Sequence, residues 1–152
     1  MNPHILEKDL VHRLGYAGLI PFFLLTLACW VADPAWLGVF IKGQLAYGVL
    51  ILSFLGGVHW GAIMLSTGLS AEVSKRALLW SVAPALAGWF ATMVGGFGFA
   101  VLIIGFIAAY RVDKRLFLVY GVAPWFIRLR FVLTCVVVAA LALTVIAANV
   151  RG

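Results

Sequence analysis

The sequence predicts an all-α, polytopic integral membrane protein: a single domain over residues 1–152, with five transmembrane helices and a short N-terminal interfacial helix. Of its 152 residues, 65% are hydrophobic and 11% are charged, whereas soluble domains are roughly 45–50% apolar. The apolar residues form long runs separated by short charged or turn segments. The net charge of +6 is spread over these separators and builds no basic face, so we expect no nucleic-acid partner.

Five spans follow from the apolar runs, each close to the roughly 20 residues that cross a hydrocarbon core about 30 Å thick. They cover residues 14–32, 44–67, 77–94, 97–112 and 129–150. The uncharged stretch 77–110 would form one helix about 51 Å long at about 1.5 Å per residue, which is too long for a single pass. We therefore divide it into two passes that meet at a turn at Gly95-Gly96.

The segment before the first span predicts the interfacial helix. Leu6, Leu10 and Leu14 share one helix face, which is typical of a helix that lies on a membrane surface. Glu7 and Asp9 make the segment too acidic for a mitochondrial transit peptide. We therefore expect the protein in a bacterial inner (cytoplasmic) membrane.

Lysine and arginine predict the orientation, because cytoplasmic loops carry an excess of both. One side of the predicted bundle holds nine of them, namely Lys8, Arg13, Lys75, Arg76, Arg111, Lys114, Arg115, Arg128 and Arg130. The other side holds Lys42 and Arg151. This distribution predicts a cytoplasmic N-terminus and a periplasmic C-terminus.

Motifs for conventional catalysis are absent from the sequence. There is no phosphate loop, paired-carboxylate site, Cys/His metal spacing or nucleophile elbow. The five acidic residues all fall outside the predicted spans. We therefore expect no enzyme activity, no catalytic or metal-binding residues and no cofactor.

Small residues recur at helical spacing in the second and third predicted spans. Ser53, Gly57 and Gly61 form a row in one span, and the other carries a matching set, namely Ala83, Ala87 and Gly88. Such rows let helix backbones approach closely. We expect the two spans to pack as an antiparallel hairpin along these rows.

His59 is the most informative polar residue in the predicted spans, because a buried imidazole needs hydrogen-bond partners. Matching depths across the bundle predicts a polar site formed by His59, Trp60, Ser81, Pro84 and Pro21. The two prolines each free a backbone carbonyl four residues earlier. The layer can be a polar knot that locks the bundle, or a binding or proton-relay site. We favour the knot, because no acid lies within the predicted spans.

Arg128 and Arg130 begin the last predicted span on the inner face. Residues two apart point to different faces of a helix, so one arginine can reach the lipid headgroups while the other turns toward the bundle. The inward arginine would pair with Asp113 or with a lipid phosphate. We expect one arginine to tolerate lysine and the other not, because a bidentate contact needs the planar guanidinium.

Three segments, "YGVLILSFLGGVHWGAIM", "SVAPALAGWFA" and "APWFIRLRFVLT", carry a resemblance to a known family. They resemble the small multi-span membrane protein family of unknown function that includes human transmembrane protein 69 and occurs in bacteria and in mitochondria. The resemblance covers roughly Leu14 to Val150. Phe126 departs from it, since tyrosine is expected after Trp125. The resemblance implies an integral membrane protein and brings no activity, substrate or cofactor.

Three classes of function remain open from the sequence. The first is a non-catalytic membrane scaffold or assembly factor that acts through helix packing, with the lipid bilayer and a second copy or another membrane protein as partners. The second is a small oligomeric channel or transporter for protons or a small solute, using His59. The third is a haem or quinone redox protein, in which a bis-histidine haem would require His59 from two protomers. We favour the first.

Overall fold

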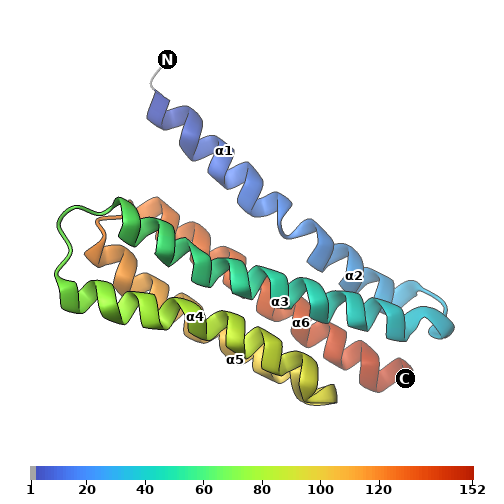
Figure 1. The fold of residues 1–152 in the computed structure, drawn as a ribbon. Helices are drawn as coiled ribbons and strands as arrows, with labels where there is room; N and C mark the ends of the chain where they lie inside the picture. The colour runs from blue at the N-terminus through green and yellow to red at the C-terminus, as the bar shows by residue number, and fades with distance from the viewer. Residues whose placement is uncertain (1–2) are drawn as a thin grey trace.

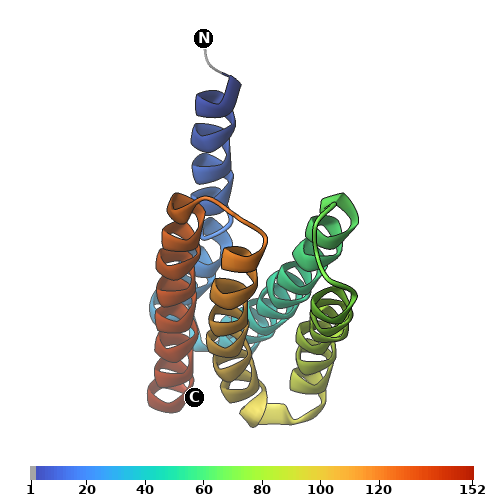
Figure 2. The same ribbon diagram turned by 90° about the vertical axis from the view of Figure 1, so that its left-hand side faces the viewer.

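The computed structural model describes the backbone of residues 3–152 and the side chains from residue 8 onward. The side chains of Leu6 and Glu7, used above for the interfacial helix, lie outside the described residues. The described chain is helical, and it contains α1 (Pro3–Ala17), α2 (Ile20–Val31), α3 (Pro34–Leu65), α4 (Ala71–Met93), the 3-10 turn η1 (Gly95–Phe97), α5 (Gly98–Val119) and α6 (Pro124–Arg151). Figures 1 and 2 show α2 to α6 side by side as a bundle, from which α1 projects.

Within the described residues, four helical segments are long and apolar enough to cross a membrane, namely Lys8–Val31, Pro34–Leu65, Gly95–Val119 and Pro124–Arg151. The protein is therefore an all-α membrane bundle. α4 does not meet the same criterion of length and hydropathy. It packs nonetheless along α3 and α5, and the turn predicted at Gly95-Gly96 lies between α4 and α5, where Gly95 adopts a φ of +56°.

The predicted interfacial helix and the first predicted span form two consecutive helices, α1 and α2, with a short bend between them. α1 continues into α2 through a short break at Gly18 and Leu19, and Figure 1 shows α1 leading away from the bundle instead of turning across its end. Pro21 lies at the start of α2, where its missing N–H is tolerated. The Tyr47 hydroxyl donates a 2.9 Å hydrogen bond to the Gly18 carbonyl. The break is thus held by α3.

Four helices extend beyond their predicted ends, among them α4, which begins at Ala71 and not at residue 77. α3 begins at Pro34, not at residue 44, because Asp33 caps it by accepting a 2.8 Å hydrogen bond from Ala35 N. α5 continues to Val119 and α6 begins at Pro124, so the charged segments read as loop are largely helical. Charged residues end an apolar run without ending a helix, which explains these errors.

The α3–α4 hairpin forms, but its contact row differs from the predicted one. Gly57 and Gly61 are exposed, and a Cβ on either would meet nothing within 4 Å. The close approach is at Gly56, where a Cβ would overlap the carbonyl oxygen of Ser81. Ser53 and Gly88 do lie at the interface, since a Cβ on Gly88 would be 3.6 Å from Ser53 Oγ. The predicted glycine row was therefore wrong by one residue.

The remaining residues predicted for packing have unequal roles. Ala87 packs against the central core, and Ala83 is half-buried. The centre of that core is built from fully buried large side chains of α2, α3, α5 and α6, namely Phe22, Leu52, Leu102, Phe106 and Leu141. At the far end, the Arg151 guanidinium donates two 2.7 Å hydrogen bonds to the carbonyls of Cys29 and Ala32. These bonds tie the end of α6 to the end of α2.

Candidate intramembrane polar site

α5 brings an acidic side chain into the bundle. Its buried face carries residues three or four apart, namely Leu102, Phe106, Ala109, Asp113 and Phe117. Asp113 is 2% exposed, whereas its charged neighbours Arg111 and Lys114 are exposed. The expectation that every acid lies outside the spans was therefore wrong for Asp113, because α5 continues as a helix past residue 112.

Asp113 joins His59 of α3 and Arg130 of α6 in a buried cluster, which we call the triad. His59 Nε2 lies 2.8 Å from Asp113 Oδ1. Arg130 donates to Asp113 Oδ2 from Nε, at 3.1 Å, and also from Nη2. His59 is 0% and Arg130 7% exposed. Both carboxylate oxygens are thus used, and the triad connects three helices.

Removing one side chain of the triad is expected to lower the stability of the protein by far more than the intact triad adds to it. Burying Asp113 and Arg130 separately would carry a desolvation cost of several kcal/mol for each ion. Their contact offsets part of that cost, because opposite charges attract strongly in a medium of low dielectric constant. The contact leaves neither charge alone and joins α5 to α6.

Tyr120, which caps the end of α5, completes the surroundings of His59. Its hydroxyl lies 3.4 Å from His59 Nδ1, and the Phe117 ring stacks on the imidazole at a centroid distance of 5.4 Å. Burial and, second, the nearby Asp113 carboxylate raise the pKa of the Tyr120 hydroxyl above its ordinary value. The protonated phenol can donate to Nδ1 while Nε2–H donates to Asp113, so both ring nitrogens of His59 are satisfied.

Four of the five residues predicted for this site do not join His59. Trp60 is 50% exposed, whereas His59 is fully buried. The Ser81 hydroxyl donates to the Leu78 carbonyl of its own helix, at 2.6 Å, and Pro84 packs beside Gly56. Pro21 belongs to the break between α1 and α2. Equal depth in the membrane predicted a shared layer, but these side chains point in other directions around their helices.

The two arginines of α6 separate as their spacing requires. Arg128 is exposed, and Arg130 turns inward to Asp113. Thr134, one turn further along α6, donates a 2.8 Å hydrogen bond to the Arg130 carbonyl. Arg130 is therefore the arginine that makes the paired contact with Asp113, and the one for which we expect lysine to be a poor replacement.

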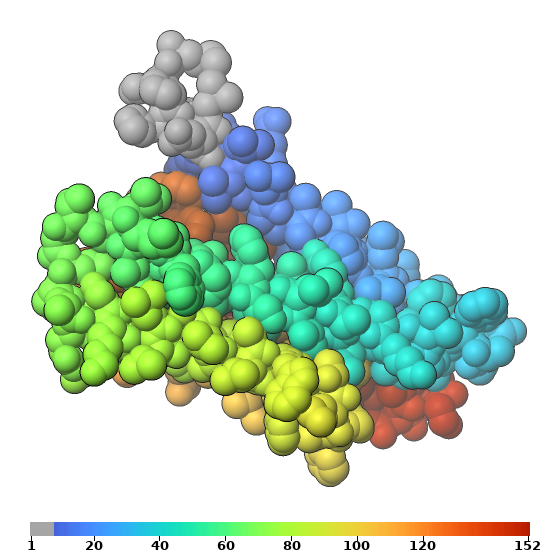
Figure 3. All heavy atoms as spheres, in the orientation of Figure 1, coloured from blue at the N-terminus to red at the C-terminus, as the bar shows by residue number. Residues whose placement is uncertain are grey.

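A cavity of about 340 Å³ lies beside the triad. All helices except α4 contribute to its wall, and most of the lining side chains are apolar. Asp113, Arg130 and Thr134 supply its polar side chains. In Figure 3, the start of α6 is visible between α1 and α3, and all three of these helices contribute residues to the cavity wall.

A second buried polar cluster lies toward the opposite end of the bundle. Gln44 Nε2 donates a 3.0 Å hydrogen bond to Thr26 Oγ1, and Thr26 in turn donates to the Ala140 carbonyl, at 3.2 Å. Thr144 Oγ1 lies 3.3 Å from Thr26 Oγ1. Gln44 Oε1 is buried without a hydrogen-bond partner among the described residues. Sequence reasoning missed this cluster, although Gln44 is a polar residue next to an apolar run.

Helices of membrane length around buried polar clusters define this chain as a polytopic α-helical membrane protein. It belongs to the family described as protein of unknown function (DUF3429), whose match covers residues 8–146. This finding confirms the resemblance inferred from the sequence. The chain also resembles two vertebrate proteins named transmembrane protein 69.

The relative from Xenopus tropicalis is 38% identical over 136 residues, which cover 84% of this chain and 50% of the relative. The relative from Mus musculus is 33% identical over 137 residues, which cover 88% and 54%. This chain thus spans about half the length of the curated relatives it matches. No solved structure matches it.

Proposed function

We propose that this protein is a non-catalytic membrane scaffold or assembly factor that binds partner helices in the bilayer. The observation that supports this function is the outward face of α3. Gly57 and Gly61 are exposed there, one turn apart, with open space around both. Without a strong hydrophobic driving force in lipid, helices associate where small residues let their backbones approach.

The surroundings of Gly61 support the same reading. A hollow of about 370 Å³ is lined by Gly61 and Ala62 of α3, by Val122 in the connection before α6, and by Trp125 and Phe126 in the first turn of α6. A partner side chain inserted there would contact two aromatic rings. The triad supports a structural role, because both Asp113 oxygens already have partners within the bundle.

For the partner we propose a second copy of this chain. In a Cys135→Ser background, Gly57→Cys and Gly61→Cys are expected to form a covalent dimer with a short bis-maleimide in native membranes. Cys29 is buried and stays silent. Ile104→Cys is the control, because it is 67% exposed on α5 but lies outside the glycine row. Dimers at Ile104 alone, or at no site, would contradict a self-association face at Gly57 and Gly61.

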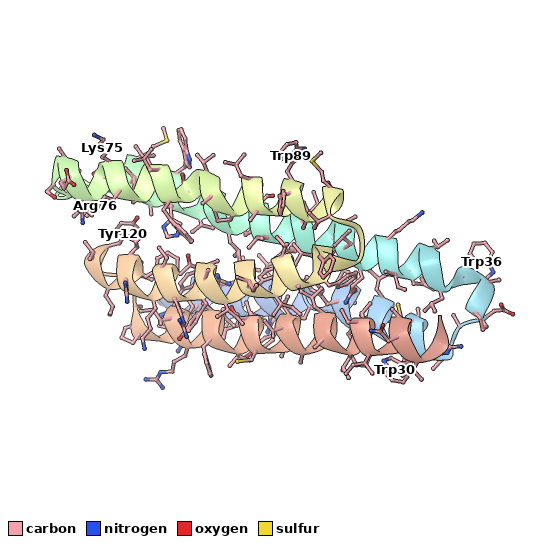
Figure 4. All side chains as sticks on the ribbon, turned by 90° about the horizontal axis from the view of Figure 1, so that it is seen from below. Trp30, Trp36, Lys75, Arg76, Trp89 and Tyr120 are labelled. Atoms are coloured by element: carbon pink, nitrogen blue, oxygen red, sulfur yellow. The ribbon has the colours of Figure 1, made fainter. Side chains whose placement is uncertain are left out.

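The proposed topology has five crossings in a bacterial inner membrane, with the N-terminus in the cytoplasm. Large apolar side chains on the outer face of α4, including Leu79, Leu86 and Trp89, support α4 as the fifth crossing. In Figure 4, Lys75 and Arg76 lie at the same end as Tyr120, and Trp30 and Trp36 lie at the other end. This separation matches the excess of basic residues on cytoplasmic sides.

A reporter fused after Gly152 tests this topology. An enzyme that is active only in the periplasm is expected to give signal there, and a matched fusion in the α3–α4 connection, after Gly68, is expected to give none. A protein with four crossings would place Gly152 in the cytoplasm. Activity of a cytoplasm-only reporter at Gly152 would therefore reject the fifth crossing.

A further inference from the structure

The cavity beside the triad has the form of a site for a molecule that comes from the bilayer. Its wall includes residues of α1, such as Val11 and Gly15, opposite Phe54 and Val58 of α3. α1 diverges from α3 toward its N-terminal end in Figures 1 and 2. The apolar part of the cavity thus lies between two helices whose outer faces are exposed, and an apolar chain could leave it into lipid.

Arg130 supplies the polar end of this cavity. Its Nε and Nη2 both donate to Asp113 Oδ2, and Nη1 has no hydrogen-bond partner among the described residues. Among the described residues, the side-chain atoms that are both fully buried and without a partner are Gln44 Oε1 and Trp80 Nε1. Nη1 has no partner and is not one of these atoms, so it is not fully buried. It belongs to a residue that lines the cavity. It offers N–H donors to an acceptor on a ligand.

The charges favour a neutral acceptor. The Asp113 carboxylate already balances the positive charge of Arg130 at this site. A carboxylate or phosphate ligand would add a second negative charge to a buried, largely apolar space, which is costly. A carbonyl oxygen can accept from Arg130 Nη1 without adding charge.

The aromatic residues favour a planar group. Phe117 and Phe126 both line the cavity, and their ring centroids are 5.4 Å apart in an edge-to-face arrangement. Phe54 and Phe106 add further aromatic surface. Aromatic rings gain from offset or edge contacts with another flat ring, beyond the area they bury.

We propose that this cavity binds a neutral membrane lipid of the quinone class, with a planar carbonyl-bearing ring next to Arg130 and an apolar tail between α1 and α3. The proposal concerns binding and includes no electron transfer. It rests on the cavity and on Arg130, not on the Gly57–Gly61 face, and the cavity borders the hollow beside Gly61 through Val58, Phe117 and Phe126.

Decylubiquinone is the probe that tests this inference. The full chain in nanodiscs of zwitterionic lipid is expected to show a saturable rise in melting temperature with decylubiquinone, and a smaller rise, or none, with dodecane or palmitate. Leu133→Trp fills the cavity from α6 without touching the triad, and it is expected to weaken binding at least tenfold. Val136→Trp is the matched control, because Val136 is 41% exposed on the same helix and does not line the cavity.

Val11→Trp, which fills the cavity from α1, serves as a second variant if Leu133→Trp does not fold. An equal rise with dodecane would overturn the role of the carbonyl. A larger rise with palmitate would overturn the assignment of a neutral ligand. Unchanged decylubiquinone binding in a folded Leu133→Trp or Val11→Trp protein would show that the cavity is not the site.

Discussion

Gly56→Leu is expected to prevent normal closure of the α3–α4 hairpin and to lower stability by about 3 kcal/mol or more. The first side-chain carbon would overlap the Ser81 carbonyl oxygen, which is backbone and cannot rotate away. Overpacking a close contact costs roughly 1–3 kcal/mol even where side chains can adjust. Thermal melts in detergent measure the loss.

The neighbouring residue provides the control. Gly57→Leu adds the same side chain one position along, where a Cβ meets nothing within 4 Å. Its effect on the isolated chain is expected to stay within about 0.5 kcal/mol, as at other exposed sites. Similar losses for Gly56→Leu and Gly57→Leu would mean that α3 does not meet α4 through Gly56.

Asp113→Asn is expected to lower stability by about 3–5 kcal/mol, because it leaves Arg130 as a buried charge without a counter-ion. Arg130→Lys is also expected to be strongly destabilising, since an ammonium cannot reproduce the two contacts that Nε and Nη2 make with Oδ2. Arg128→Lys is the matched control on the same helix, because Arg128 is exposed. Melting temperature and expression level measure all three.

A double replacement tests whether the buried pair acts as a lock. Asp113→Leu combined with Arg130→Met removes both charges while keeping similar volumes, and it is expected to recover a large part of the stability that either single change loses. Melting no different from the parent in Asp113→Asn would contradict the geometry of the triad. Equal losses in Arg128→Lys and Arg130→Lys would contradict the inward position of Arg130.

The elements of the fold that depend on hydropathy and length were accessible from the sequence. The apolar runs located α2 to α6, and the length of the uncharged stretch 77–110 required the break that Gly95 provides. The ends of helices were not accessible in the same way. Asp33 reads equally well as a turn or as a cap, and the charged residues after Tyr110 interrupt the hydropathy without interrupting α5.

The candidate site was predicted in part for a related reason. His59 and the pair Arg128 and Arg130 stood out because polar residues next to apolar runs are few. Asp113 was assigned to a loop, although Phe106, Asp113 and Phe117 follow the spacing of one helix face. Extending the helical period of α5 past the first charge would have placed the acid inside.

The choice between Gly56 and Gly57 was beyond the sequence. The two glycines are adjacent, and either could meet a neighbouring helix. The choice depends on the rotation of α3 about its axis, which is set by contacts with α4 and α5 together. One residue of error corresponds to about 100° of rotation, enough to move a predicted interface to the outer face.

The hydrogen bond from Thr26 to the Ala140 carbonyl joins residues 114 positions apart, and it has a consequence for biogenesis. N-terminal segments are made first during synthesis, so α2 reaches the membrane long before its partner α6 exists. Gln44, on the very next helix, donates to Thr26 Oγ1, so this contact between α2 and α3 does not depend on α6. We therefore expect α2 and α3 to pair first as a hairpin through this hydrogen bond, and the bond from Thr26 to Ala140 to form once α6 arrives.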